Sequence, residues 1–209
     1  MSKVRSHLSM DEFIAYASKP GVFVVDTRPL ADFCERYVPH SLNLPLNSNL
    51  DVLVRTYFNS ESTILFISEK GTEAEAVQKF SDRGVARYLG HLEGGIGGWK
   101  GRVSRIEPVT ASKVLDLMKK EKIHLLDLRE PKHFAQKHVV GAVSIPAERF
   151  DLELSSLSPS RTYFVYCTKG NRSCNAVTAM KEMGLKGFLI WNGMEEMSKL
   201  PFKFEGVAL

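Results

Sequence analysis

The sequence predicts an α/β protein built from two copies of one unit, each an open parallel sheet with helices on both faces. Three observations support this prediction. The chain repeats itself at an offset of about 100 residues, and each copy alternates short, continuous apolar strands with helical segments. The composition, 44% hydrophobic and 25% charged, is that of an ordinary globular protein. Apolar strands without polar alternation indicate a parallel sheet that is covered on both faces.

The repeat can be followed along most of the chain. Val24–Arg28 and Leu125–Arg129 are both short apolar strands that end in Asp-x-Arg. Further along, Ile64–Gly71 aligns with Tyr163–Gly170, in each case an apolar strand followed by a glycine-containing loop. We therefore expect two domains, residues 1–104 and residues 105–209.

Each copy is expected to begin with a capped helix. Ser9 and Glu12 form a capping box in the first copy, and Thr110 is the corresponding hydroxyl N-cap in the second. After the strand that ends in Asp-x-Arg come a polar helical stretch, a short β segment that ends near Pro45 or Pro146, and a second apolar strand.

A further helix is expected after the glycine-containing loop, at roughly residues 73–83 and 172–183, and it is followed by a last strand and a glycine-rich turn. In open parallel sheets, ligands bind beyond the carboxyl ends of the strands, where loops lead into helices. The loops after Ile67 and Tyr166 are therefore the places where chemistry is expected.

The composition excludes several classes of protein. No apolar run exceeds five residues, whereas a membrane span needs about 20. Residues 1–7 are not followed by an apolar stretch of signal-peptide length, and three cysteines do not make a disulfide framework. These features favour a cytoplasmic location without membrane contact.

The net charge of +4 lies entirely in the second copy, because residues 1–103 carry 12 basic and 12 acidic side chains and residues 104–209 carry 16 and 12. Four lysines fit the solvated face and C-terminal end of one helix: Lys113, Lys119, Lys120 and Lys122. A nucleic-acid-binding patch is the alternative, but no zinc-finger, helix-turn-helix or RNA-recognition motif accompanies these lysines. We therefore expect no nucleic-acid partner.

The loop of the second copy, Cys167–Ser173, combines a nucleophile with several features that attract anions. Gly170 lets the backbone curl so that successive N–H groups point inward as an anion-binding nest. The following helix adds its positive end, and Lys169 and Arg172 add full charges. These features favour the thiolate and predict a nucleophilic Cys167 inside an anion pocket. A buried structural cysteine is the alternative.

At this point the chain resembles the rhodanese homology domain. The segments that carry the resemblance are Leu126–Glu130, Phe134–Pro146 with its core His138–Ala142, and Cys167–Ser173, and the similarity covers essentially the whole chain as a tandem pair. The resemblance implies an α/β sulfurtransferase fold. It also implies that Cys167 takes sulfane sulfur from a donor, holds it as a persulfide and passes it to a nucleophilic acceptor.

The resemblance assigns roles to the rest of the loop as well. The backbone N–H groups would stabilise the thiolate and the persulfide, and Lys169 and Arg172 would bind an anionic donor such as thiosulfate or a low-molecular-weight persulfide. The residues implied to bind substrate are Thr168, Lys169, Gly170, Asn171, Arg172 and Ser173.

The corresponding loop of the first copy, Ser68–Ala74, opposes this chemistry. Serine stands in place of the nucleophile with no evident base to activate it, and Glu73 replaces the arginine and would repel an anionic donor. We therefore expect a degenerate, inactive first copy that packs on the active one or recognises a partner. A hydrolase based on Ser68 is the alternative.

The second copy departs from the family pattern at its glycine-rich turn. The first copy keeps two glycines and a tryptophan in Gly94–Trp99, whereas the second copy has Trp191–Met194 at this place, with Met197 near the tryptophan position. This departure alters the expected wall of the pocket and leaves the donor undefined.

Spacing separates the sulfurtransferase from its nearest rival. Four residues separate Cys167 from Arg172. The phosphatases and arsenate reductases that share the rhodanese fold have a longer loop, with one more residue between the cysteine and the arginine. A tighter loop suits one sulfur atom better than a tetrahedral phosphate. The phosphatase remains an alternative.

The expected partners are a small-molecule sulfur donor and a thiol or cyanide acceptor. A module that delivers persulfide to a protein acceptor and a non-catalytic scaffold are alternatives. The pair is also similar to the C-terminal part of bacterial persulfide dioxygenase–rhodanese fusions, which implies a persulfide dioxygenase partner domain and a role in sulfide detoxification. The histidine-rich metal motif of the metallo-β-lactamase-like domain in those fusions does not occur in this sequence.

The remaining cysteines and histidines are expected to be structural. Cys174 should pack in the first helical turn rather than act as a resolving thiol, and Cys34 should be an incidental, partly exposed thiol. His138 should make a structural hydrogen bond, and Asp127 and Arg129 should form a fold-stabilising pair near the strand end. The six histidines show no metal-ligand spacing, so neither a metal nor another cofactor is expected.

Overall fold

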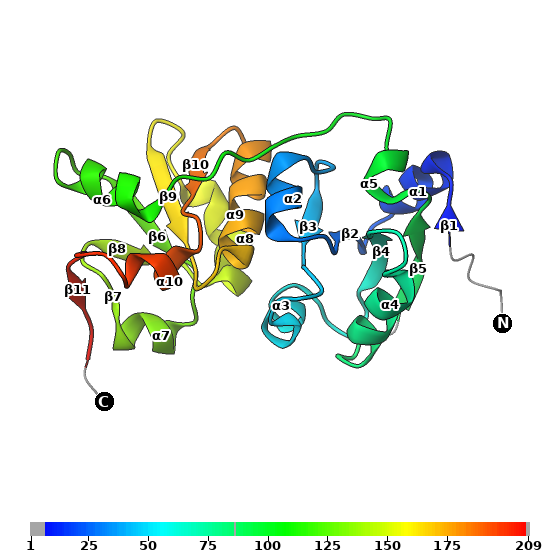
Figure 1. Cartoon of the computed structure of the whole chain (residues 1–209), viewed down its shortest axis with the longest axis horizontal. Coiled ribbons are helices and arrows are strands. Elements are labelled where there is room, and N and C mark those ends of the chain that lie inside the picture. The colour runs from blue at the N-terminus through cyan, green and yellow to red at the C-terminus, as the bar shows by residue number, and fades with distance from the viewer. Residues whose placement is uncertain (1–6, 86, 208–209) are drawn as a thin grey trace. The chain divides into compact units, whose positions relative to one another are not determined.

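The computed structural model describes residues 7–85 and 87–207, and the chain divides between Arg105 and Ile106 into two compact units (Figure 1). Each unit is built on a parallel sheet flanked by helices, so the predicted fold class is confirmed. Of residues 1–7, behind which the sequence shows no apolar stretch of signal-peptide length, residues 1–6 lie outside the described residues.

The sheet of the first unit has five parallel strands in the order β1-β5-β4-β2-β3. Their bounds, in that order, are His7–Leu8, Arg87–Leu92, Thr63–Ile67, Val22–Asp26 and Ser41–Asn43. Asp26 at the end of β2 is in register with Ile67 on one side and Asn43 on the other. The carboxyl ends of these three strands therefore meet at one edge, as the sequence predicts.

Helices cover both faces of this sheet. On one face, α1 (Met10–Ala17) and α5 (Gly95–Gly98) contribute Phe13 and Ile96 to an apolar cluster on the strands. On the other face, α3 (Leu50–Tyr57) and α4 (Glu73–Ser81) pack against Ile64 and Phe66. The predicted capping box at the start of α1 is present, and α2 (Leu30–Glu35) follows β2.

The sheet of the second unit has four parallel strands in the order β10-β9-β6-β8. Their bounds, in that order, are Lys186–Leu189, Thr162–Tyr166, His124–Asp127 and Ala142–Ser144. A separate antiparallel pair joins β7 (His138–Val139) to β11 (Phe204–Glu205).

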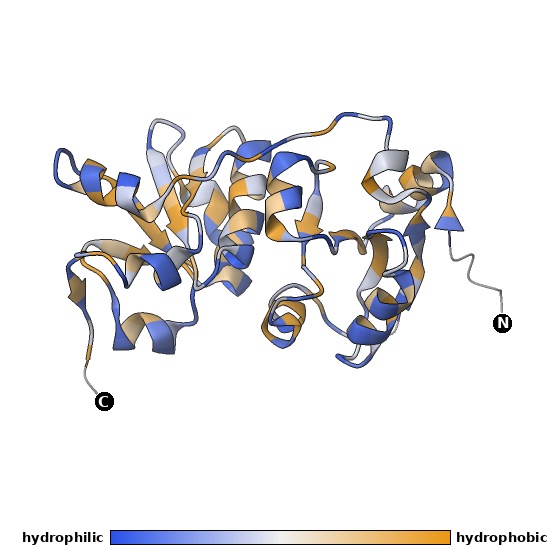
Figure 2. Cartoon of the chain, viewed as in Figure 1, coloured by the Kyte–Doolittle hydropathy of each residue, from blue (hydrophilic) through white to orange (hydrophobic). Residues whose placement is uncertain are grey.

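The second unit is also covered on both faces. Alternate residues of a strand point to opposite faces, so Phe164 and Tyr166 of β9 pack on α6 (Ala111–Met118) and α10 (Gly193–Met197). The long helix α9 (Asn171–Glu182) packs on β9 and β10 from the other face. The strands are mostly hydrophobic along their length and the helices are mixed, as amphipathic helices on an apolar sheet should be (Figure 2).

The two copies differ in the stretch that links β3 to β4 in the first unit and β8 to β9 in the second. In the first unit, the eight-residue helix α3 spans this stretch. In the second unit, α7 (Pro131–Gln136) and β8 are followed by three short pieces, η1 (Ala147–Arg149), α8 (Phe150–Glu153) and η2 (Leu154–Ser156). This stretch is therefore a place where the second copy is less regular than the first.

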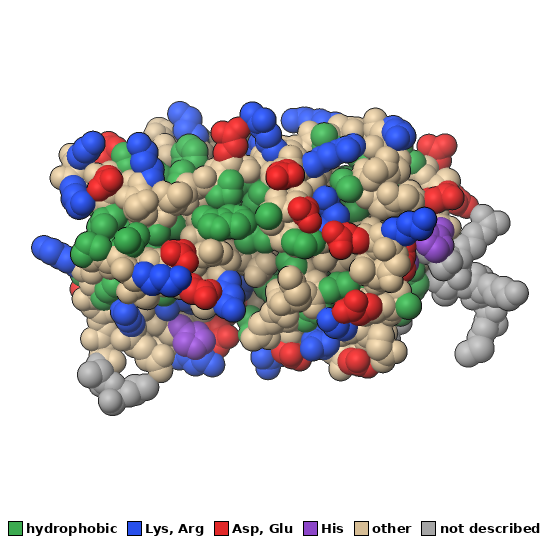
Figure 3. Space-filling model, in the orientation of Figure 1, with side chains coloured by type: hydrophobic (Ala, Val, Ile, Leu, Met, Phe, Trp, Pro, Cys, Tyr) green, Lys and Arg blue, Asp and Glu red, His purple; other side chains and the backbone are tan. Residues whose placement is uncertain are grey.

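The described residues include no helix that is long and apolar enough to cross a membrane. Basic and acidic side chains are interspersed over the face of the molecule that Figure 3 shows, rather than gathered into a patch of one sign. Of the four lysines predicted to be solvated, Lys113 lies on α6, and Lys119, Lys120 and Lys122 follow its end; all four are exposed.

Candidate functional site

The predicted loop of the second unit lies between β9 and α9. Cys167 is the first residue after β9, and Gly170 is the N-cap of α9 with a φ of +104°. A side chain other than hydrogen is strained at this φ, so glycine allows the chain to turn directly from strand into helix. The loop therefore stands at the carboxyl edge of the sheet, with the positive end of a 12-residue helix beside it.

The thiol of Cys167 is buried, with 2% of the residue exposed, and it faces hydrogen-bond donors. The backbone N–H of Gly170 donates to Sγ at 3.2 Å. The hydroxyl of Ser173 lies 3.5 Å from Sγ and 3.0 Å from the carbonyl oxygen of Gly170. Because a hydroxyl has one hydrogen, Ser173 can donate either to the carbonyl or to a negatively charged sulfur. Both contacts stabilise an anionic sulfur at this position.

Arg172, at the start of α9, is 7% exposed and only partly satisfied. Its Nη2 lies 3.5 Å from Oγ1 of Thr168, and its buried Nη1 has no hydrogen-bond partner among the described residues. A buried guanidinium nitrogen without an acceptor is costly, so the site favours an additional anionic acceptor. Lys132 at 2.8 Å and, more weakly, the positive charge of Arg172 lower the pKa of the Glu130 carboxyl.

The other predicted loop residues are placed as follows. Thr168 and Lys169 are exposed and Asn171 is half-buried, while Gly170 and Ser173 are buried beside the sulfur. The structure thus brings Gly170 and Ser173 to the sulfur. It shows no hydrogen bond from Thr168, Lys169 or Asn171 to the sulfur within the described part of the chain.

Behind the loop, Asp127 and Arg129 form the predicted fold-stabilising pair. Nη2 of Arg129 lies 2.6 Å from Asp127, its Nε bonds both carboxylate oxygens, and Nη2 also donates to the carbonyl of Lys137. Burial alone would lower the pKa of Arg129, but the hydrogen bonds and charge of Asp127 raise it, and the sulfur of Cys167 adds to this effect. The pair joins β6 to β7 and places a fixed positive charge in electrostatic reach of Cys167.

The glycine-rich turn keeps its geometry in spite of the departure in sequence. Asn192 adopts the left-handed conformation at φ +53°, as Gly94 does at +71° in the first unit. The next residue, Gly193, packs so closely that a Cβ atom there would lie 2.2 Å from the carbonyl oxygen of Cys167. The N–H groups of Met194 and Glu195 bond the carbonyls of Cys167 and Thr168. These hydrogen bonds and this close packing therefore fix the backbone of the Cys167 loop against the turn.

The loop of the first unit is arranged differently. The N–H of Gly71, which corresponds to Gly170, donates to Oε2 of Glu73 at 2.7 Å. The carboxylate that replaces the arginine thus takes the loop amide that faces sulfur in the second unit. Ser68 is 4% exposed and accepts a hydrogen bond from Thr27 at 3.0 Å. The amide of Gly71 is therefore satisfied within the loop, without an external anion.

The expectation that no base accompanies Ser68 is wrong, because a histidine lies within hydrogen-bond distance of its hydroxyl. Nδ1 of His91 lies 3.3 Å from Oγ of Ser68. The sequence did not show this partner because His91 is 23 residues away on β5, which pairs with β4. The signal that could have found this partner is the position of His91 near the carboxyl end of β5, the strand beside β4.

His91 nevertheless has the properties of a buried structural histidine. It is 2% exposed and stacks on Phe66 with a centroid distance of 5.3 Å. Burial lowers the pKa of His91 to about 4, against the opposing effect of Glu73. The ring is therefore neutral near pH 7, and it completes a chain of hydrogen bonds from Thr27 through Ser68.

The remaining cysteines and histidines have structural positions. Cys174 is fully buried in the first turn of α9, as predicted, whereas Cys34 is only 4% exposed, so the predicted partial exposure is wrong. Cys34 is buried because it lies on the inner side of α2 next to Phe33. His138 bonds the carbonyl of Phe134 through Nδ1 at 2.7 Å, as predicted. No group of potential metal ligands occurs among the described residues.

Comparison with known families identifies both units. The model of the rhodanese-like domain matches the chain twice, at residues 9–102 and at residues 110–199. This chain belongs to the rhodanese-like family. It is a tandem pair of rhodanese-like domains, as the resemblance in sequence implied.

Curated relatives are similar over part of their length. The thiosulfate sulfurtransferase PspE of Escherichia coli K12 is 35% identical over 63 residues, which cover 29% of this chain and 61% of PspE. An uncharacterized protein of Synechocystis, slr1261, is 30% identical over 77 residues, which cover 37% of this chain and 43% of slr1261. The matched stretch is thus less than two thirds of either relative.

Solved structures match either about half of this chain or nearly all of it. A rhodanese-related protein of Thermoplasma volcanium matches with a TM-score of 0.44 and 22% sequence identity. The match covers 47% of this chain and 97% of the chain of that protein. A thiosulfate sulfurtransferase of Pseudomonas aeruginosa matches with a TM-score of 0.42 and 19% sequence identity. The match covers 97% of this chain and 44% of the chain of that protein.

Proposed function

We propose that the second rhodanese-like domain is a sulfurtransferase that carries sulfane sulfur on Cys167. The observation that carries this proposal is the environment of Sγ: a buried sulfur that accepts the N–H of Gly170 at 3.2 Å, in the same loop as a buried Arg172 with an unpartnered Nη1. The first feature suits an anionic sulfur, and the second suits the anionic part of a donor. The thiosulfate sulfurtransferase PspE among the relatives supports the same reaction class.

The transfer balances without a further oxidant or reductant. The thiolate of Cys167 attacks the outer sulfur of thiosulfate, the sulfur–sulfur bond of the donor breaks, and sulfite leaves with the bonding electron pair. The product is a persulfide anion on Cys167, and the donor N–H of Gly170 and the hydroxyl of Ser173 lie next to it. A thiolate or cyanide acceptor then attacks the terminal sulfur, and the Cys167 thiolate is released.

We propose that the first domain does not carry sulfur. Ser68 has no thiol, and the carboxylate of Glu73 occupies the loop amide of Gly71 and adds negative charge where a donor anion would bind. A hydrolase based on Ser68 gains a histidine contact, but the low pKa of His91 makes it a weak base at neutral pH and the serine is buried.

Intact-mass spectrometry after brief exposure to thiosulfate, and separately to glutathione persulfide, tests the proposal. We expect a mass gain of one sulfur atom that disappears with cyanide and is absent from Cys167→Ser. Cys174→Ser, which removes a buried cysteine seven positions away, should still load sulfur. No gain with either donor would refute the sulfurtransferase. Fast loading with slow turnover on cyanide and thiols would favour the alternative, in which the persulfide goes to a protein acceptor.

A further inference from the structure

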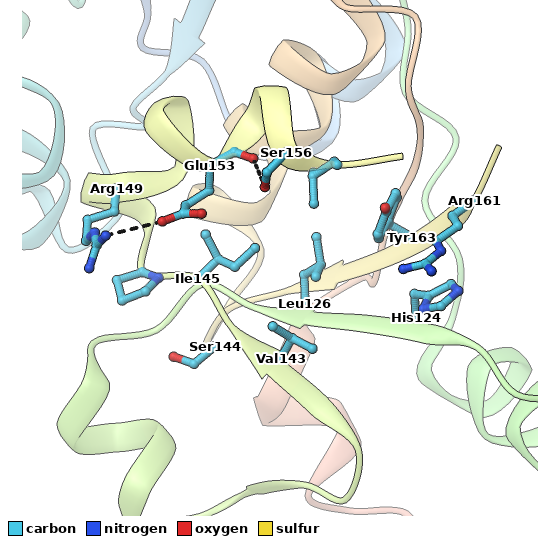
Figure 4. Close-up of a pocket in the computed structure, with 12 residues that line it drawn as sticks. His124, Leu126, Val143, Ser144, Ile145, Arg149, Glu153, Ser156, Arg161 and Tyr163 are labelled. Atoms are coloured by element: carbon cyan, nitrogen blue, oxygen red, sulfur yellow. Dashed lines mark hydrogen bonds and ion pairs between the residues drawn. The ribbon is translucent and has the colours of Figure 1, made fainter. Parts of the chain in front are cut away.

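The second unit contains a cavity of about 360 Å³ that is separate from the Cys167 loop (Figure 4). Its size lies in the range of pockets that hold small molecules. The floor is one face of the sheet, with Leu126, Val143 and Ile145, and the cover is the irregular segment that follows β8. The polar lining residues are His124, Ser144, Arg149, Glu153, Ser156, Arg161 and Tyr163.

The same place is filled in the first unit. Val25, Leu42 and Leu44 correspond to the three floor residues, and α3 packs on them in one apolar cluster that includes Tyr57 and Phe58. In the second unit, Val143 is left 57% exposed. The hollow is therefore a property of the second copy and not of the fold.

The residues that open the cavity can be identified from a shared turn. The N–H of Ser62 bonds the carbonyl of Asn59 in the first unit, and the N–H of Arg161 bonds that of Ser158 in the second. Counting back from this turn, Ser156 and Leu157 stand where the first unit has Tyr57 and Phe58. Two aromatic rings are replaced by a hydroxymethyl group and an aliphatic side chain, and this loss of volume leaves the space.

The charges around the cavity select the kind of ligand. At one end, Arg149 is paired with Glu153 at 3.2 Å. At the other end, Arg161 lies beside His124 and Tyr163, and no carboxylate pairs with Arg161 among the described residues (Figure 4). The positive charge of Arg161 is therefore uncompensated at this end of the cavity, next to an apolar floor.

We propose that this cavity binds a small amphipathic carboxylate, whose apolar body lies on Leu126, Val143 and Ile145 and whose single negative charge pairs with Arg161. The charged end of this site is remote from the sulfur, because Arg161 precedes β9 and Cys167 follows it, so that the five strand residues between them span roughly 16 Å.

Titration of the full chain with octanoate, followed by amide chemical shifts in NMR, tests this proposal. We expect saturable binding with shifts gathered at residues 124–126, 143–145 and 156–163. Octylamine, which has the same chain and the opposite charge, should not saturate the same amides. The filling variant Ser156→Tyr/Leu157→Phe should abolish binding.

The charge variant keeps the proposal testable if the filling variant does not fold. Arg161→Gln should weaken octanoate binding by about fivefold, as expected for one partly exposed ion pair, whereas Lys120→Gln at the exposed end of α6 should leave binding unchanged. Both variants should still load sulfur on Cys167, because neither residue belongs to that loop. Absence of saturation, shifts confined to residues 168–173, or equal binding by Arg161→Gln would each overturn the proposal.

Discussion

Two buried ionisable groups, Asp127 and His91, influence stability for different physical reasons. Asp127 is fully buried, and Arg129 donates short hydrogen bonds to its carboxyl group from both Nε and Nη2. His91 is buried without an opposing charge in hydrogen-bond contact, and it stays neutral because burial lowers its pKa to about 4. A buried charge depends on its partner, whereas a buried neutral histidine depends on the pH.

Removal of the carboxylate should strongly destabilise the second unit. Asp127→Ala leaves the Arg129 guanidinium buried without its main partner, and the expected loss is about 3–5 kcal/mol in the free energy of unfolding. Urea denaturation measures this loss. Asp116→Ala breaks an exposed pair with Lys119 and should leave the unfolding midpoint unchanged. Equal midpoints for the two variants would contradict the structural role of the Asp127–Arg129 pair.

Acid should destabilise the first unit through His91. The unfolded chain takes up a proton near pH 6.5, but the folded chain does so only near pH 4, so stability falls as the pH decreases between these values. The expected contribution is about 2–3 kcal/mol between pH 7 and pH 4.5. In His91→Leu, which introduces the residue type that Leu189 provides at the matching strand position of the second unit, this part of the pH dependence should be absent. Denaturation of both proteins at the two pH values gives the comparison.

At the scale of elements, the position of the Cys167 loop depends on the first turn of α10. The N–H groups of this turn bond the carbonyls of Cys167 and Thr168, and Gly193 provides the close approach. The first unit has the same close approach, because a Cβ atom on Gly95 would lie 2.4 Å from the carbonyl oxygen of Ser68. This close contact between the glycine turn and the loop after the strand is therefore present in both units.

A methyl group at this contact should displace the Cys167 loop. Gly193 has a φ of +44° and its added Cβ meets Cys167 backbone atoms, so Gly193→Ala should cost about 2–5 kcal/mol and lower sulfur loading. Gly184→Ala is the matched control, because Gly184 has a φ of +71° with nothing within 4 Å of an added Cβ. It should cost only about 1–2 kcal/mol and leave loading intact. Equal loading by the two variants would show that the contact does not position the loop.

At the scale of the whole molecule, each unit has its own apolar core. Two clusters pack on the two faces of the first sheet, and a third packs on the second sheet. The chain also has one tryptophan in each unit, Trp99 and Trp191. Tryptophan fluorescence can therefore report the unfolding of each unit separately.

The two units should respond independently to mutation. In a Trp191→Phe background, Trp99 reports the first unit, and Asp127→Ala should not shift its unfolding midpoint. In a Trp99→Phe background, the same substitution should shift the midpoint reported by Trp191, because Asp127 belongs to the second sheet. Shifts of equal size in both backgrounds would show that the two units unfold as one.

Much of this protein follows from its linear sequence. The repeat, the parallel sheets and the loop after Tyr166 are predictable because apolar periodicity, helix caps and Asp-x-Arg are local patterns that appear twice. The Asp127–Arg129 pair is predictable because its two members are two residues apart. Local patterns of this kind predict structure directly, because the strand or helix that contains them sets their geometry.

Tertiary structure decided the features that join distant segments. The contact of His91 with Ser68 arises from strand pairing across 23 residues, and the burial of Cys34 arises from the way α2 packs. The unpartnered Nη1 of Arg172 and the cavity above Val143 depend on what is missing from their surroundings. A one-dimensional pattern does not contain these facts, because hydrogen-bond satisfaction and packing volume are properties of neighbours in space.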